Sequence, residues 1–211
     1  MPPSVVTVVS DAPPTDAPSD GRRLRSQESR RKIVQALMEL VRDGQLEPSA
    51  EVVAERAGVG LRSVFRHFKD MEGLRREMSE IVEGELRELV DRPFAGATWR
   101  DHLTDVVHRR AEVFERVMPY RRAGSLQAHR SSFLQSNKAR VNHTLRVTLR
   151  AILPEALATD ATLFEALDLT LSFESWIRLR HDQALTPDDA RRVWERTVRA
   201  LIAEAEDPTT P

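Results

Sequence analysis

The chain has 211 residues, a formal net charge of −1, no cysteine and 31% charged residues. This length can bury a sizeable core, and the lack of cysteine excludes disulfides, zinc–thiolate sites and thiol catalysis. No uncharged apolar run reaches the roughly 18 residues of a membrane span, and the first residues lack the basic start of a secretory signal. We therefore expect a soluble, cytoplasmic protein.

The first 20 residues differ in composition from the rest of the chain. They are rich in proline, aspartate, serine and threonine and contain three acidic and no basic side chains. This composition predicts a disordered tail, or residues upstream of the functional start of the protein that have no role. Residues 21–80 carry 13 Lys and Arg against 10 Asp and Glu, so the modest positive charge is concentrated there.

The apolar spacing predicts helices and no strands. One apolar stripe runs from residue 26 to 43, and Ser49 is a residue type that caps the start of a second helix. Gly58 stands where that helix would end, because glycine tolerates the left-handed conformation required there. A third helix is predicted to begin near Gly60. Asp70 is predicted to cap a fourth helix that runs to about Val90.

Residues 51–70 predict two short helices joined by a tight turn. Val64 and Phe68 are four residues apart and are expected to face inward. The side chains left to face a partner are Arg62, Ser63, Arg66 and His67. This is the arrangement of a helix-turn-helix, whose second helix enters the major groove of DNA.

The stretch from about residue 30 to 78 resembles the DNA-binding head of the TetR family of bacterial transcriptional regulators. The matching pieces are RKI at 31–33, AERAGV at 54–59, SVFRHF at 63–68 and DMEGL at 70–74. The resemblance implies an all-α fold with a three-helix head and a larger C-terminal helical domain for ligand binding and dimerisation, about nine helices in total. We expect a tail at 1–20, the head at 21–80 and the second domain at 81–211.

The resemblance also implies particular DNA contacts. Arg62 and Ser63 are expected to contact bases, with Leu61 as an apolar contact. An arginine paired with guanine gives about 1–3 kcal/mol of discrimination against another base. Positions that contact or flank phosphates are Phe65, Arg66, His67 and Lys69. Ser49 is expected to bond a phosphate while capping its helix. A flexible arm of Arg22, Arg23 and Arg25 is expected to reach an adjacent minor groove.

Two residues depart from the family pattern. Phe65 stands where tyrosine is commoner and has no hydroxyl, and Met71 stands where lysine is usual. We therefore expect weaker DNA binding, or a smaller salt dependence, than in a typical member.

The C-terminal part predicts further helices. Thr98 and Asp101 are spaced close to a capping box, and that helix is expected to end near Val117 because Pro119 follows. The next helices are expected at 121–153, at 161–182 and at 186–204, the last with Pro187 at its first position. Apolar stripes on the last two helices either complete an intrachain core or form a four-helix bundle in a homodimer, which the resemblance favours.

A small-molecule pocket between residues 98 and 179 is the control element that the resemblance implies. Its candidate lining residues are Trp99, Phe114, Met118, Tyr120, Phe133 and Trp176, although an aromatic or methionine side chain at helical spacing more often belongs to a core. His129, Arg130 and Asn137 are candidate polar contacts. The pairs His102 with Asp105 and His108 with Glu112 have metal-ligand spacing but are typical of a solvated surface. We expect no metal, cofactor or catalysis, since no phosphate loop or nucleophile motif is present.

These observations favour a TetR-like transcriptional repressor. It would bind a two-fold operator in double-stranded DNA as a homodimer and be released by a small-molecule effector of unknown identity. The alternative is an all-α small-molecule-binding protein whose head has lost DNA affinity, which Met71 and Phe65 would explain.

Overall fold

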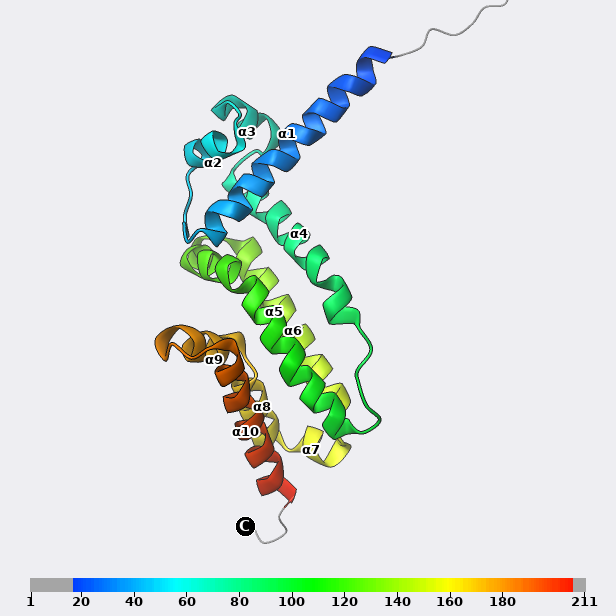
Figure 1. The fold of residues 1–211 in the computed structure, drawn as a ribbon. Helices are drawn as coiled ribbons and strands as arrows, with labels where there is room; N and C mark the ends of the chain where they lie inside the picture. Colours follow the sequence, from blue (N-terminus) through cyan, green and yellow to red (C-terminus); the bar gives the residue numbers. More distant parts are fainter. Residues whose placement is uncertain (1–16, 207–211) are drawn as a thin grey trace, which may run out of the picture.

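The computed structural model describes residues 17–206, with side chains from residue 21 onward. Within this range the chain forms ten α-helices, one 3-10 turn and one π-helical turn, and no strand (Figure 1). The prediction of an all-α fold is confirmed, with ten α-helices where about nine helices were expected. Residues 1–16, most of the predicted tail, lie outside the described residues.

The N-terminal elements are α1 (Ala17–Arg42), α2 (Ala50–Ala57), α3 (Leu61–His67) and α4 (Met71–Asp91). The C-terminal elements are α5 (Trp99–Gln127), η1 (Ala128–Arg130), α6 (Ser132–Ile152), α7 (Glu155–Thr159), α8 (Ala161–Thr170), α9 (Phe173–Ile177), η2 (Arg178–Asp182) and α10 (Pro187–Glu206).

The helices α1 to α4 enclose the first of two hydrophobic cores. Val53 of α2 is fully buried, as are Ile33 of α1 and Leu74 of α4. This core continues along α4 to Leu89, past the predicted domain boundary at residue 80. The helix α4 therefore connects the two parts of the molecule and is not only the end of the head.

The long helix α5 passes through Pro119, where the sequence predicted an interruption. A proline inside a helix removes one backbone hydrogen bond, at a cost of about 3 kcal/mol. Here both flanks are held by packing, because Phe114 is buried in the C-terminal core and Ala123 in the N-terminal core. The expected end near Val117 was wrong for this reason. The predicted capping box of Thr98 and Asp101 at the start of α5 is confirmed.

The segment 121–153, predicted as one helical stretch, divides between the end of α5, the turn η1 and α6. The predicted helix 161–182 likewise divides into α8, α9 and the π-helical turn. Ser172 causes the second break, because its hydroxyl accepts a hydrogen bond from the Ser175 amide and so starts a new helix.

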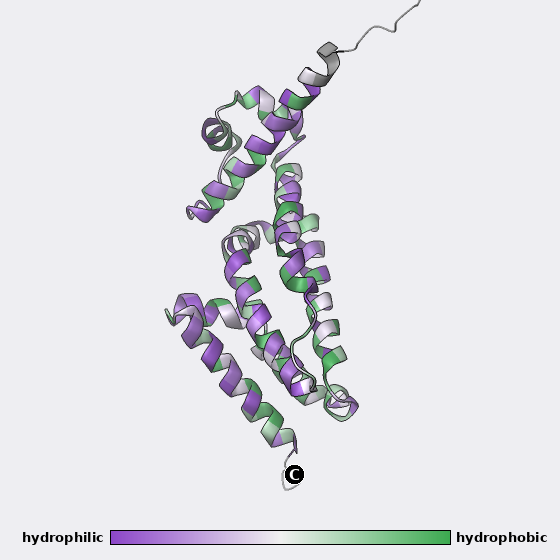
Figure 2. Ribbon diagram, turned by 45° about the vertical axis from the view of Figure 1, so that its right-hand side comes forward, coloured by the Kyte–Doolittle hydropathy of each residue, from purple (hydrophilic) through white to green (hydrophobic). Residues whose placement is uncertain are grey.

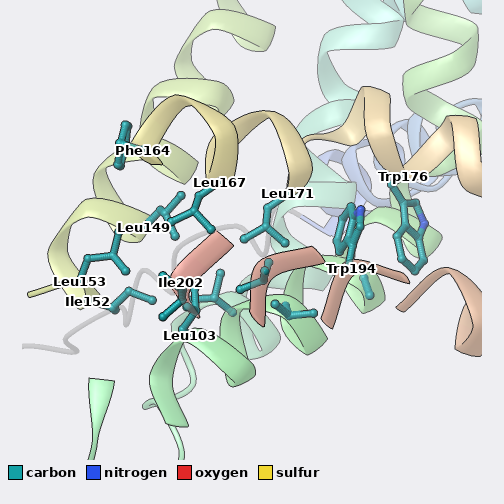
Figure 3. Close-up of a cluster of buried hydrophobic side chains, with 14 of the residues drawn as sticks. Leu103, Leu149, Ile152, Leu153, Phe164, Leu167, Leu171, Trp176, Trp194 and Ile202 are labelled. Carbon is teal, nitrogen blue, oxygen red and sulfur yellow. The ribbon is translucent and has the colours of Figure 1, made fainter. Parts of the chain in front are cut away.

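The C-terminal core lies between α5, α6, α8, α9 and α10. Its labelled side chains converge from these helices in Figure 3, where Trp176 and Trp194 lie next to each other. The ring centroids of these two tryptophans are 4.6 Å apart, and both side chains are almost fully buried. The two cores meet along α5, where Val113 and Val117 pack against both of them.

The last helix, α10, begins at Pro187 as predicted, and Thr186 accepts a hydrogen bond from the Asp189 amide. Figure 2 shows hydrophilic and hydrophobic residues mixed along the helices, each apolar face being turned toward a core. Of the helices in the described range, none is long and apolar enough to cross a membrane.

Candidate nucleic-acid interface

The helix-turn-helix predicted from the sequence is present. Ser49 caps α2 by accepting a hydrogen bond from the Val52 amide, and Gly58 ends this helix in the left-handed conformation, with φ of 65°. The next helix, α3, begins after Gly60, as expected. A residue with a Cβ at position 58 would be strained by this φ value, so glycine is what permits the tight turn.

The recognition helix α3 is anchored by apolar residues on its inner side. Val64 is 1% exposed and Phe68, just after the helix, is 4% exposed, and both belong to the N-terminal core. The inward orientation predicted for both residues is confirmed. Their burial leaves the opposite side of α3 free to meet a partner.

The outer side of α3 combines cationic and apolar groups. Leu61, Arg62, Phe65, Arg66 and Lys69 are all exposed. The Arg66 guanidinium donates a 3.2 Å hydrogen bond to the Ser63 hydroxyl, so these two side chains are held together. Within residues 21–206, Arg62, Arg66 and Lys69 form no ion pair. Such unpaired cations on one helix face are suited to the phosphates and base edges of DNA.

His67 is only partly exposed. Its Nε2 atom is buried and has no hydrogen-bond partner among the described residues. Burial lowers the pKa of this imidazole, and the nearby charges of Arg66 and Arg30 lower it further. Its role in contacting or flanking a phosphate stays a prediction.

A contact that the sequence reasoning missed holds the end of α3 in place. The guanidinium of Arg30, on α1, donates a 2.7 Å hydrogen bond to the His67 carbonyl and forms an ion pair with Glu77 of α4. It also lies over the Phe68 ring, 4.3 Å from its centroid. Arg30 thus links three helices around the recognition helix. Sequence pattern did not reveal this role because its partners are 37 and 47 residues away.

Ser49 remains a candidate phosphate ligand with competing contacts. Its hydroxyl serves as the α2 cap and also hydrogen-bonds Glu51, which lowers the pKa of that carboxyl. A phosphate would have to replace the Glu51 contact.

The expected arm of Arg22, Arg23 and Arg25 is helical. The helix α1 begins at Ala17, earlier than the predicted start at residue 26, and its first turns project away from α2 and α3 (Figure 1). The three arginines are exposed. The flexible arm expected at these residues is therefore a helix, in which Pro18 lies in the first turn, where proline is tolerated. The DNA contact of the three arginines stays a prediction.

The six predicted ligand-binding residues are distributed over both cores and the surface. Phe114 and Trp176 are buried in the C-terminal core, where Phe114 makes an edge contact with Phe173. Trp99 and Met118 pack against the same core, Tyr120 packs against the N-terminal core, and Phe133 lies under the Arg76 guanidinium. The ligand role of these residues stays a prediction.

Two surface hollows lie within the described residues, and His129 and Arg130, two of the predicted polar contacts, line the first of them. A hollow of about 460 Å³ lies where the α1–α2 loop, the start of α4 and the end of α5 meet, and another of about 430 Å³ lies between α8, α9 and α10. None of the six predicted residues lines either of them.

The histidine–acid pairs serve as structural contacts. His102 stacks on Phe94, and the His108 Nε2 lies 2.7 Å from a Glu195 oxygen. Asp105 pairs with Arg109 and Arg92, and Glu112 pairs with Arg116. In the described part of the chain, no cluster of three or more His, Asp or Glu side chains is arranged to hold a metal ion.

Comparison with known proteins gives structural matches. No family model matches the chain, and no curated protein matches it by sequence. A crystal structure of a proposed TetR-family transcriptional regulator from Rhodococcus sp. matches with a TM-score of 0.62 and 19% identity, over 83% of this chain and 99% of that one. A second, of a transcriptional regulator from Rhodococcus sp. Rha1, matches with a TM-score of 0.63 and 19% identity, over 82% of this chain and 96% of that one. This chain therefore has the all-α fold seen in TetR-family transcriptional regulators.

Proposed function

We propose that this protein is a TetR-like transcriptional repressor that acts in the cytoplasm, binds a two-fold DNA operator as a homodimer and is released by a small-molecule effector. One observation carries the proposal: Arg62 and Arg66 on the outer face of α3, and Lys69 just beyond its end, are exposed and have no carboxylate partner among the described residues, while Val64 and Phe68 are buried beneath them. A helix built only to pack or to stay soluble would not need three unpaired cations around an exposed phenylalanine.

The face of α3 divides into groups suited to bases and groups suited to the backbone. Arg62 is on the first turn, where a recognition helix approaches base edges, and its guanidinium can form two hydrogen bonds to a guanine. Lys69, just beyond the helix, is suited to a phosphate. Phe65 is 49% exposed and can contact a thymine methyl or sugar atoms.

Dimerisation would place two such heads one helical turn apart, about 34 Å, on a two-fold site. The surface between α8, α9 and α10 supports this part of the proposal. Leu169 is 71% exposed and Val193 39% exposed, and both border the 430 Å³ hollow together with Trp194 and Leu179. A second copy that applied the same face would bury these apolar groups in a self-complementary interface.

Effector release would use α4 as the connection. The inner face of α4 shares a core with α1, and Val113, Val117 and Tyr120 of α5 pack against the same core. A shift of α5 would therefore move α4 and with it the head. An effector that bound one arrangement more tightly would change the population of heads at the operator spacing.

The test is a fluorescence-anisotropy titration of the full chain against the DNA upstream of its own and neighbouring genes, repeated from about 50 to 300 mM salt. We expect one fragment to bind more tightly than random duplex, with a log–log salt slope of about −0.9 per phosphate contact. Equal affinity for every fragment and for random duplex would contradict the proposal.

A variant protein tests the alternative, an all-α ligand-binding protein whose head does not bind DNA. Met71 packs partly against the N-terminal core at the start of α4, in place of a cation. If the Met71→Lys variant binds an upstream fragment and the native protein does not, the alternative is supported. If both bind, we expect the variant to show a salt slope steeper by about 0.9.

A further inference from the structure

The hollow between the head and the C-terminal helices has a lining of mixed charge. Its walls come from Glu47 in the α1–α2 loop, Glu72 and Arg75 on α4, and Leu126, His129 and Arg130 at the end of α5 and in η1. Its volume of about 460 Å³ lies within the range of small-molecule sites, about 300–1,000 Å³. It is thus a ligand-sized space bounded by both parts of the molecule.

The cationic groups of this hollow form no hydrogen bond or ion pair within residues 21–206. The Arg75 guanidinium forms no hydrogen bond, ion pair or ring contact within residues 21–206, although this residue is half-buried. Partial burial lowers the pKa of Arg75, while the charges of Glu47, Glu72 and Asp70 act in the opposite direction. The side chains of His129 and Arg130 also have no hydrogen-bond or ion-pair partner in the described range. Because a guanidinium removed from water favours a charged acceptor, Arg75 is suited to a carboxylate ligand.

The acidic groups of the hollow retain free acceptor capacity. One Glu47 oxygen accepts a 3.0 Å hydrogen bond from the Gln127 amide, and one Glu72 oxygen lies 3.7 Å from Arg76. A carboxylate offers about four acceptor positions, so each of these groups can accept from a further donor. Two carboxylates beside the arginines disfavour a ligand that carries only negative charge.

We propose that this junction hollow binds a small zwitterion of the free amino-acid type, with its carboxylate on Arg75 and Arg130 and its ammonium group on Glu47 and Glu72. An apolar side chain of the ligand would lie against Leu126, which is 48% exposed. His129 and Arg130 were also candidate polar contacts of the pocket predicted from the sequence, but none of the six apolar and aromatic residues predicted to line that pocket borders this hollow.

The position of the hollow gives its ligand an effect on the head. Glu72 and Arg75 lie in the first two turns of α4, and Asp70, the N-cap of that helix, directly follows Lys69 of the recognition surface. Arg130 belongs to η1, on the C-terminal side. A ligand held by both parts would favour one orientation of α3 relative to α5, and so would change DNA affinity. Only this regulatory step rests on the proposed function.

The binding step is tested on the DNA-free full chain by thermal unfolding and calorimetry. The probes are L-alanine, L-leucine and L-phenylalanine, with 4-methylpentanoate and 3-methylbutylamine as leucine analogues that each lack one charged group. At ten times its dissociation constant, a bound probe should raise Tm by about 3–6 °C. We expect at least one amino acid to do so, and both analogues of leucine to bind more weakly than leucine.

The location is tested with two variants and a matched control. Arg75→Gln and Arg130→Gln should each weaken the bound amino acid about 10- to 100-fold, the effect of losing a charge-assisted hydrogen bond. Arg130 is exposed, so its variant remains informative if Arg75→Gln proves unstable. The control is Arg87→Gln, an exposed arginine three turns further along α4. It should bind the amino acid like the native protein.

Each result decides a separate part of the inference. No Tm shift or heat from any amino acid at about 10 mM would overturn the site, as would equal weakening by Arg87→Gln and the two test variants. If 4-methylpentanoate bound more tightly than leucine, the inference that the ligand is a zwitterion would be overturned. Unchanged operator affinity at saturating ligand would overturn the regulatory step. If the protein bound no DNA, the proposed function would fail, and the calorimetry would still decide the site.

Discussion

The arginines of α3 and Arg110 of α5 have opposite surroundings in this molecule. Arg110 of α5 is 5% exposed and donates to the Leu171 carbonyl at 3.0 Å and to the Leu145 carbonyl at 2.5 Å. Arg62 and Arg66 of α3 are exposed and form no ion pair with any described residue. An arginine side chain thus joins helices in one region, and in the other region arginine side chains are left available for a partner.

The physical basis of the difference is how many acceptors tertiary packing places around each guanidinium. Burial lowers the pKa of Arg110 to about 10, yet the group stays charged at neutral pH and satisfies the carbonyl at the end of α8. The outer face of α3 has no neighbouring helix to provide such acceptors. Substitutions of the two kinds of arginine should therefore separate stability from DNA binding.

The largest effect is expected from Arg110→Ala. The variant leaves the Leu171 carbonyl buried without this donor and opens a cavity, so the free energy of unfolding should fall by about 2–5 kcal/mol. The measurement is the urea midpoint at constant m-value. A loss below about 1 kcal/mol would show that water replaces the guanidinium. Operator affinity of the molecules that remain folded should be unchanged.

The converse effect is expected from Arg62→Ala. Operator affinity should fall by about 1–3 kcal/mol, or 5- to 150-fold, because one base contact is lost. The urea midpoint should stay unchanged, since this side chain is exposed and forms no ion pair within residues 21–206. Anisotropy titrations against the operator and against the operator with its guanines replaced provide the readout. Arg87→Ala, on α4, is the control and should bind like the native protein.

An intermediate effect is expected from Arg30→Ala, because Arg30 joins helices and also holds the end of the recognition helix. It contacts the His67 carbonyl and Glu77, and is partly exposed. Its loss should lower stability by about 1 kcal/mol and operator affinity about fivefold, since the end of α3 is no longer held. Glu77→Gln should reproduce part of the affinity loss. Native DNA affinity in both variants would contradict a positioning role.

The smallest effect concerns His67 and pH. Because burial, Arg66 and Arg30 lower the pKa of this imidazole below 6.5, the unfolded chain takes up a proton at a pH where the folded protein does not. This contribution to stability is present above about pH 6.5 and is lost as the pH falls through the lower folded pKa. In His67→Gln the decline between about pH 6.5 and 5 should be shallower. Parallel curves for the two proteins would contradict the assignment.

Short-range signals in the sequence predicted the local elements of the head well. Ser49, Gly58, Asp70 and the pair Thr98–Asp101 act at helix ends, through hydrogen bonds or backbone angles within a few residues. The inward orientation of Val64 and Phe68 followed from helical spacing. These features depend on near neighbours in the chain, so the sequence contains what is needed to predict them.

Predictions that depended on distant neighbours were less accurate. Pro119 did not end α5, because the two cores hold the helix on both sides. The helix predicted at 161–182 is broken after Leu171, where Arg110 satisfies the free carbonyl. The burial of the His67 Nε2 atom was not predicted from the sequence.

The sequence by itself determined an all-α protein with a helix-turn-helix whose outer face is cationic, since helical periodicity and helix ends are properties of neighbouring residues. Tertiary structure alone decided which cations stay free, which ones link helices, and that Arg75, Arg130, Glu47 and Glu72 surround one hollow. The physical reason is that burial and pairing of a charge depend on groups brought close by folding from distant parts of the chain, and no local pattern encodes that proximity.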